Sequence, residues 1–204
     1  MEKYEISRAS LGRIPAYLNY LDSLDRDTVT ISATAIAKAL GLGEVQVRKD
    51  LALFCKSGKP KIGYPAEELQ KDLRHALGCE NGNAVLIGAG QLGRALLEYS
   101  GFEAYGTTVL AGFDTAVQEE THLPSGKSIL PAGELETFCK AHDVRIGVIT
   151  TPPASAQSVL DRLHACGVKL ILCFAPVRLK APADTVVQYV NLALSLAHLK
   201  TQSR

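Results

Sequence analysis

The sequence lacks the features that would place the chain in a membrane or outside the cell. No uncharged apolar run approaches the ~20 residues that a bilayer span requires. Residues 1–8 contain no apolar core of the kind that a secretory signal peptide has. The five cysteines are scattered and form no CxxC pair: Cys55, Cys79, Cys139, Cys166 and Cys173. Such a set is typical of reduced, mostly buried thiols, so we expect a cytoplasmic protein with no metal and no membrane partner.

An excess of charge of one sign is also absent, because the 204 residues carry a net charge of +1. Overall neutrality excludes no class of partner, since charge can be concentrated locally. Apolar residues make up 47% of the chain, which is enough to build the core of one large domain or of two small ones.

A glycine-rich turn stands near the middle of the chain. A short apolar run, Ala84–Ile87, predicts a buried strand, and a helix is expected at Arg94–Tyr99. Between them lies a Gly-x-Gly-x-x-Gly motif. The next apolar run, residues 107–113, ends in Asp114, about 20 residues after the last glycine. A strand before the motif, a helix after it and an acid at the end of the next strand are typical of a Rossmann dinucleotide site.

Each part of this motif has a chemical role beside a pyrophosphate. Gly88 permits the tight turn, Gly90 lets the backbone approach the ligand, and Gly93 lets helix and strand pack closely. The free N–H groups at the helix N-terminus attract the phosphates. Asp114 would bind a ribose 2′-hydroxyl and repel a 2′-phosphate, so NAD(H) is predicted over NADP(H). A glycine-rich turn without a ligand is the alternative.

Strands alternate with helices beyond Asp114, which predicts a doubly wound parallel sheet. Ligands of such sheets lie at the carboxyl ends of the strands. Two loops there, residues 150–153 and 173–177, are candidates for the nicotinamide end, although both would also serve as proline-stiffened turns. The predicted cofactor-binding residues are Gly88, Ala89, Gly90, Gln91, Leu92, Gly93, Asp114, Thr150, Thr151, Pro152, Phe174, Ala175 and Pro176.

The N-terminal part of the chain predicts a helix-turn-helix. Helices are expected at residues 33–40 and 44–54, joined by a turn with two glycines. A basic, glycine-containing loop follows at residues 56–64, where a winged-helix domain carries its wing. Between residues 44 and 63, five cations stand against two acids, a local charge of +3.

The second of these helices is suited to reading DNA. Val47, Leu51 and Phe54 share one side and are expected to pack inward. On the other sides, cations can reach phosphates, Arg and Gln can pair with base edges, and Ala permits a close approach. A helical hairpin with a solvated charged face is the alternative. The predicted DNA-binding residues are Gln46, Arg48, Lys49, Ala52, Lys56, Lys59, Lys61, Gly63 and Tyr64.

With these motifs in place, the chain resembles the Rex family of redox-sensing transcriptional repressors over nearly its whole length. The most specific pieces are Gln-Val-Arg-Lys-Asp-Leu from Gln46, Gly-Ala-Gly-x-Leu-Gly-Arg-Ala-Leu from Gly88, and Phe-Ala-Pro-Val-Arg-Leu from Phe174. The resemblance implies a winged-helix domain, a Rossmann domain that senses NADH against NAD⁺, and a homodimer with exchanged C-terminal helices. It also implies that NADH favours release of DNA.

The chain departs from the family pattern on its DNA side and in one loop. The family has Ser and Tyr where this chain has Ala52 and Leu53. The wing of the family reads Lys-Arg-Gly-Val-Gly-Tyr, whereas residues 59–64 read Lys-Pro-Lys-Ile-Gly-Tyr. The loop that begins with Asn in the family begins here with Cys173.

The resemblance also implies a set of switch residues. In the family an Asp exchanges between a tyrosine that matches Tyr99 and an arginine that matches Arg13. That Asp is Asn191 in this chain, which keeps hydrogen bonding but loses the charge. We therefore expect binding of DNA and NAD(H) together with a weakened or altered switch.

Three domains are predicted: a winged-helix domain at residues 1–79, a Rossmann NAD(H) domain at 80–190, and a dimerisation helix at 191–204. The last of these is too apolar to stay free, so it is expected to pack on its own sheet or on a partner subunit. The predicted protein is a dimeric repressor of double-stranded operator DNA and no enzyme, because it has no substrate domain and no positioned acid or base. A small NAD- or CoA-binding Rossmann protein or dehydrogenase without DNA regulation is the alternative.

Overall fold

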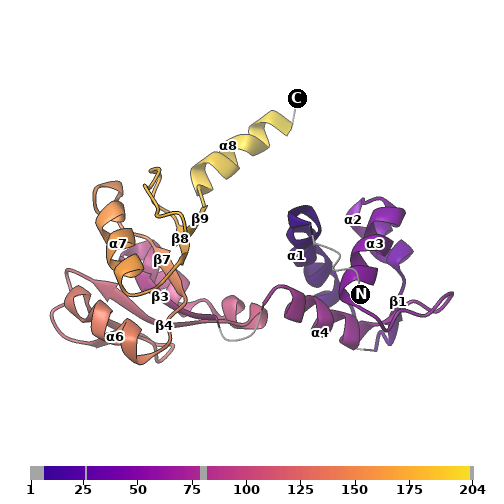
Figure 1. The fold of residues 1–204 in the computed structure, drawn as a ribbon, viewed down its shortest axis with the longest axis horizontal. Coiled ribbons are helices and arrows are strands. Elements are labelled where there is room, and N and C mark those ends of the chain that lie inside the picture. The colour runs from indigo at the N-terminus through magenta and orange to yellow at the C-terminus, as the bar shows by residue number, and fades with distance from the viewer. Residues whose placement is uncertain (1–6, 26, 79–81, 203–204) are drawn as a thin grey trace. The chain divides into compact units, whose positions relative to one another are not determined.

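The chain forms two compact units that divide after residue 80 (Figure 1). The computed structural model describes residues 7–25, 27–78 and 82–202. Cys79 and part of the predicted boundary between the domains lie outside the described residues, as do most of residues 1–8, in which no signal peptide is predicted. No helix in the described ranges is long and apolar enough to cross a membrane.

The first unit is a small helical domain with a two-stranded antiparallel sheet. Its elements are α1 (Arg8–Asp22), β1 (Thr30–Ile31), α2 (Ala33–Leu40), α3 (Glu44–Phe54), β2 (Tyr64–Pro65) and α4 (Ala66–Ala76). β1 pairs with β2, so the chain between α3 and β2 forms the wing. Side chains from all four helices are fully buried in its core: Ile14, Tyr17, Leu18, Ile36, Val47, Leu51, Leu69 and Leu73.

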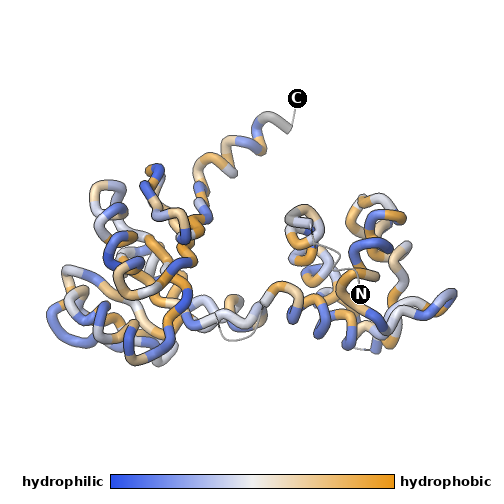
Figure 2. Tube along the Cα trace, viewed as in Figure 1, coloured by the Kyte–Doolittle hydropathy of each residue, from blue (hydrophilic) through white to orange (hydrophobic). Residues whose placement is uncertain are grey.

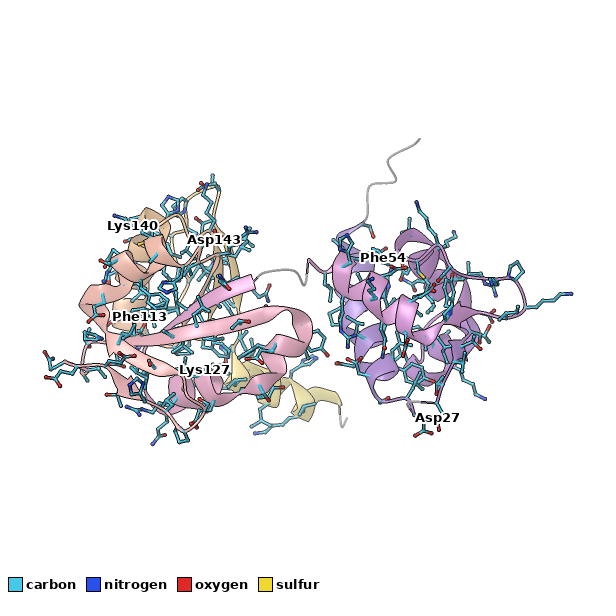
Figure 3. All side chains as sticks on the ribbon, turned by 90° about the horizontal axis from the view of Figure 1, so that it is seen from below. Asp27, Phe54, Phe113, Lys127, Lys140 and Asp143 are labelled. Atoms are coloured by element: carbon cyan, nitrogen blue, oxygen red, sulfur yellow. The ribbon has the colours of Figure 1, made fainter. Side chains whose placement is uncertain are left out.

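Local chemistry sets the helix-turn-helix. The Ser32 hydroxyl accepts the N–H of Ala35 at 3.1 Å and caps α2 at its start. Gly41 closes α2 with φ of +64°, a left-handed conformation in which glycine is favoured. In α3, Val47 and Leu51 are buried, and Phe54, labelled in Figure 3, is half-buried at its end.

The second unit is a seven-stranded sheet with helices. Its elements are β3 (Gly82–Ile87), α5 (Gln91–Glu98), η1 (Ser100–Tyr105), β4 (Thr107–Asp114), β5 (Thr121–His122), β6 (Ser128–Pro131), η2 (Ala132–Glu134), α6 (Leu135–Ala141), β7 (Ile146–Ile149), α7 (Pro153–Ala165), β8 (Leu170–Cys173), β9 (Val186–Tyr189) and α8 (Leu192–Gln202). The sequence did not predict β5 or η1. α5 begins three residues before its expected start, because Gly90 serves as its N-cap.

The strand order is β5-β6-β4-β3-β7-β8-β9, and every pair is parallel except β5 with β6. The parallel strands follow the order of a Rossmann sheet, in which the chain starts in the middle and builds outward on both sides. The predicted doubly wound fold is therefore confirmed. Ile87 at the end of β3 lies opposite Phe113 of β4 and Ile149 of β7, so the three central strands end at the same edge.

The core of this unit lies on both faces of the sheet. Phe113, labelled in Figure 3, is fully buried and makes an edge-to-face contact with Phe138 of α6. Cys139 and Cys173 are also buried, and Cys166 is half-buried. Burial and the contact between Cys139 and Cys166 raise the pKa of Cys139 to about 12, so this thiol stays protonated near neutral pH.

The terminal helix α8 is not covered by the rest of the described chain. Figure 2 shows apolar residues along its length. Four leucines of α8 are each more than half exposed: Leu192, Leu194, Leu196 and Leu199. Of the two expected arrangements, packing on its own sheet is therefore not seen.

Candidate functional site

The glycine-rich turn between β3 and α5 is shaped by contacts that only glycine allows. Gly88 has φ of +100°, and a Cβ there would lie 2.8 Å from the backbone nitrogen of Thr151. A Cβ on Gly93 would overlap the carbonyl oxygen of Gly88, so α5 starts directly against the turn. Gly90 differs, because a Cβ there would meet nothing within 4 Å. The backbone is thus closely packed on one side of the turn and open on the other.

The N-terminus of α5 faces this open side. Gly90 provides no side-chain cap, and the first hydrogen bond of the helix runs from Arg94 N–H to Gly90 O at 2.9 Å. The N–H groups of the preceding residues have no acceptor within the helix. Such a turn of backbone donors at the positive end of the helix dipole suits a phosphate.

Asp114 ends β4 beside the same turn. One of its carboxylate oxygens accepts the N–H of Ala89 at 2.7 Å, and the other accepts the N–H of Ala116 at 2.9 Å. The side chain is half-buried. These bonds hold the carboxylate against the glycine-rich turn, and each oxygen keeps acceptor capacity for a further donor.

Two adjacent threonines follow β7 and differ in their bonding. The N–H of Thr150 donates to Ile87 O at 2.9 Å, and its hydroxyl lies 2.7 Å from Gly88 O, which ties β7 to the turn. The hydroxyl of Thr151 is buried and has no hydrogen-bond partner in the described part of the chain. A buried polar group without a partner is costly, so an ordered water or a ligand atom beside this hydroxyl would stabilise the site.

These parts line one cleft of about 760 Å³, a volume within the usual range for small-molecule sites. Most of the predicted cofactor residues line it: Gly88, Gly90, Leu92, Asp114, Thr150, Thr151, Pro152, Phe174, Ala175 and Pro176. Ala89, Gln91 and Gly93 belong to the turn and to α5 but do not line the cleft. The N–H of Phe174 donates to Ile149 O at 2.9 Å, which sets the β8 loop beside the β7 loop.

Sequence reasoning missed one wall of the cleft, which α7 provides. Ser155, Ser158 and Arg162 line it and recur at helical spacing, a signal that was available once α7 was expected after the proline loop. Arg162 forms two hydrogen bonds with Glu136, at 2.6 and 2.9 Å, and a third with Ala132 O at 2.6 Å. The hydrogen bonds from Arg162 lower the pKa of Glu136.

The first unit presents the predicted DNA-binding side chains on α3 and the wing. Gln46, Arg48, Lys49 and Ala52 of α3 are all exposed, as are Lys56, Lys59 and Lys61. Arg48 also pairs with Glu44 one turn earlier on the same helix.

Gly63 and Tyr64 have a different setting from the other predicted DNA-binding residues. Gly63 has φ of +99°, and a Cβ there would overlap the carbonyl oxygen of Ile31. Tyr64 is buried and pairs with Ile31 in the small sheet. Both residues therefore join the wing to β1 rather than offering side chains at the surface.

A buried ion pair joins α1 to α3. Arg13 donates to the two carboxylate oxygens of Asp50 at 2.6 and 2.8 Å, and the Tyr17 hydroxyl donates to the same carboxylate at 2.6 Å. Asp50 is only 3% exposed. Burial would raise the pKa of Asp50, but the hydrogen bonds from Arg13 and Tyr17 outweigh it and lower the pKa. Burial, followed by the bond to Asp50, raises the pKa of Tyr17 to about 12.

The other two predicted switch residues lie in the second unit. Tyr99 is 56% exposed and makes an edge-to-face contact with Phe102. Asn191 is exposed, and its side-chain oxygen accepts the N–H of Leu194 at 2.9 Å. Asn191 therefore caps α8 at its start.

The fold and the site define a two-domain protein that joins a winged-helix unit to a Rossmann nucleotide-binding unit. Two family models match it: "Putative DNA-binding protein N-terminus" over residues 5–52 and "CoA binding domain" over residues 79–177. Redox-sensing transcriptional repressors named Rex are similar over almost the whole chain. The relative from Desulfitobacterium hafniense is 36% identical, across 96% of this chain and 94% of its own. The relative from Carboxydothermus hydrogenoformans is 37% identical, across 96% and 95%.

Solved structures agree with these relatives. A structure of RSP in complex with β-NAD⁺ and operator DNA matches with a TM-score of 0.87 and 32% identity, covering 98% of this chain and 94% of that one. RSP in complex with β-NADH matches with a TM-score of 0.85 and 31% identity, covering 98% and 95%. RSP is a Rex-family repressor. The present chain belongs to the Rex family of redox-sensing transcriptional repressors, which confirms the resemblance in its sequence.

Proposed function

We propose that this protein is a redox-sensing repressor that binds operator DNA through α3 and the wing and binds NAD(H) in the cleft of the second unit. NADH favours release of the DNA. One observation carries the cofactor site: a cleft lined by Gly90 on its open side, by the start of α5 with its free N–H groups, and by Thr150 and Thr151 after β7. A dinucleotide offers phosphates to the N–H groups and polar groups to the threonine.

Asp114 supports the choice of NAD(H) over NADP(H). Its carboxylate is fixed by the N–H groups of Ala89 and Ala116, so it cannot turn away from a ligand in the cleft without losing both bonds. A ribose 2′-hydroxyl would donate to it, whereas a 2′-phosphate would be repelled. The cofactor acts here as a ligand that reports the redox state, and we assign no catalytic residue.

The DNA site follows from the exposed side of α3. Arg48 and Lys49 are exposed on a helix whose opposite side, Val47 and Leu51, is buried. A helix held in this way can enter a major groove, where its cations meet phosphates or base edges. Binding of operator DNA by the relative RSP supports the same role.

A homodimer is proposed because the apolar surface of α8 is exposed and would be stabilised by burial. Its exposed leucines form an apolar surface on a helix that the rest of the described chain leaves uncovered. Burial against a second copy would cover it and would give the two-fold symmetry that paired half-sites require. In light scattering, the Leu196→Glu, Leu199→Glu double variant is expected to be monomeric. If the variant stays dimeric, α8 does not form the dimer interface.

A titration of the purified protein tests the cofactor and the DNA together. NADH, NADPH and CoA are titrated calorimetrically, and a duplex from upstream of this gene is titrated with NAD⁺ or NADH present. We expect tighter binding of NADH than of NADPH, no binding of CoA, and weaker DNA binding with NADH. Binding of CoA alone, or NADH without any DNA binding, would favour the Rossmann protein without DNA regulation. A repressor of this kind acts in the cytoplasm, with neither a membrane nor a metal partner.

A further inference from the structure

A second cleft lies in the first unit, between the wing and the start of α2. It has a volume of about 630 Å³. Three cationic residues line it, Arg48 from α3 and Lys59 and Lys61 from the wing, and none of its lining residues is acidic. Ser32 and Thr34 at the start of α2 complete the lining with hydroxyl groups. Arg48 also pairs with Glu44, which lies outside the lining, so Lys59 and Lys61 supply the uncompensated charge. A cleft lined by these cations and by hydroxyl groups is suited to an anion.

The wing that carries two of these cations has an unusual backbone. Lys59 and Gly63 exchange two backbone hydrogen bonds, of 2.8 and 2.9 Å, and Ile62 N–H donates to Lys59 O at 3.2 Å. The turn inside this hairpin has Pro60 and then Lys61, and Lys61 has φ of +66°. This is the pattern of a type II turn, whose third position usually holds glycine or asparagine.

A lysine in this conformation is strained, because its Cβ is crowded by the backbone. The strain is confined to one exposed residue, since Pro60 is well suited to the position before it. Glycine would relieve the strain without altering the hairpin. Strained residues cluster at functional sites, and Lys61 lines the cationic cleft.

We propose that this cleft holds one phosphate of the DNA backbone, with Arg48, Lys59 and Lys61 as its counter-charges. The inference rests on the proposed DNA-binding function and assigns these three residues to the phosphate rather than to base edges. The backbone at the start of α2 adds donors to the site. Ser32 accepts the N–H groups of Ala35 and Ile36, so only the two N–H groups before them are left for a ligand. The two earlier N–H groups of the helix have no acceptor within it.

The test uses the full chain with the change Lys61→Gly. Binding is measured by fluorescence anisotropy on a labelled operator duplex and on a labelled random-sequence duplex across a range of salt concentrations. Because the variant removes one of the three counter-charges from the phosphate site of each protomer, the slope of log affinity against log salt should fall in magnitude on both duplexes, by at most about 0.9 for each protomer bound. Thermal stability should stay the same or rise, because glycine accepts the left-handed conformation.

Two further variants serve as matched controls. Lys61→Arg keeps the charge and should keep the salt slope. Lys71→Gln removes one charge from the exposed side of α4 and should leave DNA binding unchanged. Thr34→Glu places a carboxylate at the start of α2, where acids favour the helix, and should weaken binding to both duplexes without loss of stability.

The outcomes separate this inference from the function on which it rests. If the natural protein binds neither duplex, the proposed function fails. If it binds both and Lys61→Gly leaves affinity and salt slope unchanged, only the phosphate site fails. A loss of preference for the operator with an unchanged salt slope would assign Lys61 to a base edge and would also overturn the proposal.

Discussion

The two candidate sites of this protein differ in whether backbone groups or side chains form them. The nucleotide cleft is made mostly of backbone: the turn at Gly88, the N–H groups of α5 and the aligned ends of β3, β4 and β7. The DNA side is made of exposed side chains on α3 and the wing. A backbone site fixes which residues the sequence can carry, whereas an exposed side-chain site lets residues change without loss of the fold. The departures from the family pattern at Ala52, Leu53 and the wing fall on that second site.

The largest effect should come from breaking the backbone site in two ways. In Gly93→Val the new side chain overlaps the carbonyl of Gly88, so the second unit should fail to fold. In Gly90→Val the side chain enters open space, so the unit should fold but lose NADH. Circular dichroism melts and NADH titration of both variants check this. A folded, NADH-binding Gly93→Val protein would contradict the close packing of the turn.

The next effect concerns the ion pair behind the DNA side. Asp50→Ala leaves the guanidinium of Arg13 and the hydroxyl of Tyr17 without their shared partner. Removing one member of a buried pair costs about 3 kcal/mol or more. Arg13 remains 22% exposed, so the lower value is expected. Urea unfolding followed by circular dichroism measures the destabilisation, and a change below about 1 kcal/mol would show that the pair contributes little.

The same pair predicts a dependence on pH. The hydrogen bonds of Asp50 lower its pKa in the folded protein despite its burial. A carboxyl with a lowered folded pKa stabilises the fold above its unfolded pKa of about 3.9 and loses that contribution as pH falls through the folded value. The difference in stability between the natural protein and Asp50→Asn should therefore be constant above about pH 5 and shrink in more acid solution. A difference that grows in acid would reverse the sign of this linkage.

Breaking the side-chain site should leave the fold intact. The Arg48→Ala, Lys49→Ala double variant removes two exposed cations and one exposed pair with Glu44, so its melting temperature should change little. DNA affinity should fall on every duplex because the phosphate contact of Arg48 is lost, and a base contact of Lys49 would add a loss of roughly 1–3 kcal/mol on the operator. Lys140→Ala, on the exposed side of α6, is the control and should bind DNA normally (Figure 3). If the natural protein, the double variant and Lys140→Ala bind DNA with equal affinity, α3 does not contact the DNA.

The sequence predicted features set by the backbone better than contacts between side chains of different elements. The spacing of three glycines and the position of Asp114 predicted a turn whose residues line one cleft in the structure, because backbone geometry leaves few alternatives. Asp50 was counted only as one of the two acids of residues 44–63 and as part of the family motif that begins at Gln46. Its spacing from Val47 and Leu51 puts it on the buried side, where a carboxylate needs a partner. The sequence does not predict that this partner is Arg13 of another helix, because the contact arises from tertiary packing. The same holds for the unpaired hydroxyl of Thr151.

The smallest effect is expected at Asn191, where charge alone is changed. Asn191 caps α8, and aspartate caps a helix as well as asparagine does, so Asn191→Asp should leave stability nearly unchanged. The family resemblance predicts that this residue competes for Arg13, and in the structure the carboxylate of Asp50 already holds Arg13. A neutral amide is a weak competitor, because a charged hydrogen bond is about twice as strong as a neutral one.

Asn191→Asp should therefore enlarge the ratio of DNA affinities measured with NAD⁺ and with NADH, because a ligand shifts an equilibrium only by its difference in affinity for the two states. Asn191→Ser, which caps α8 without a charge, should keep the natural ratio. Fluorescence anisotropy with saturating NAD⁺ or NADH measures it for all three proteins. A ratio that is already large and does not move would place the switch elsewhere. The loops Thr150–Pro153 and Cys173–Pro176 are then the better candidates, since they line the cleft and are joined through the bond between Phe174 and Ile149.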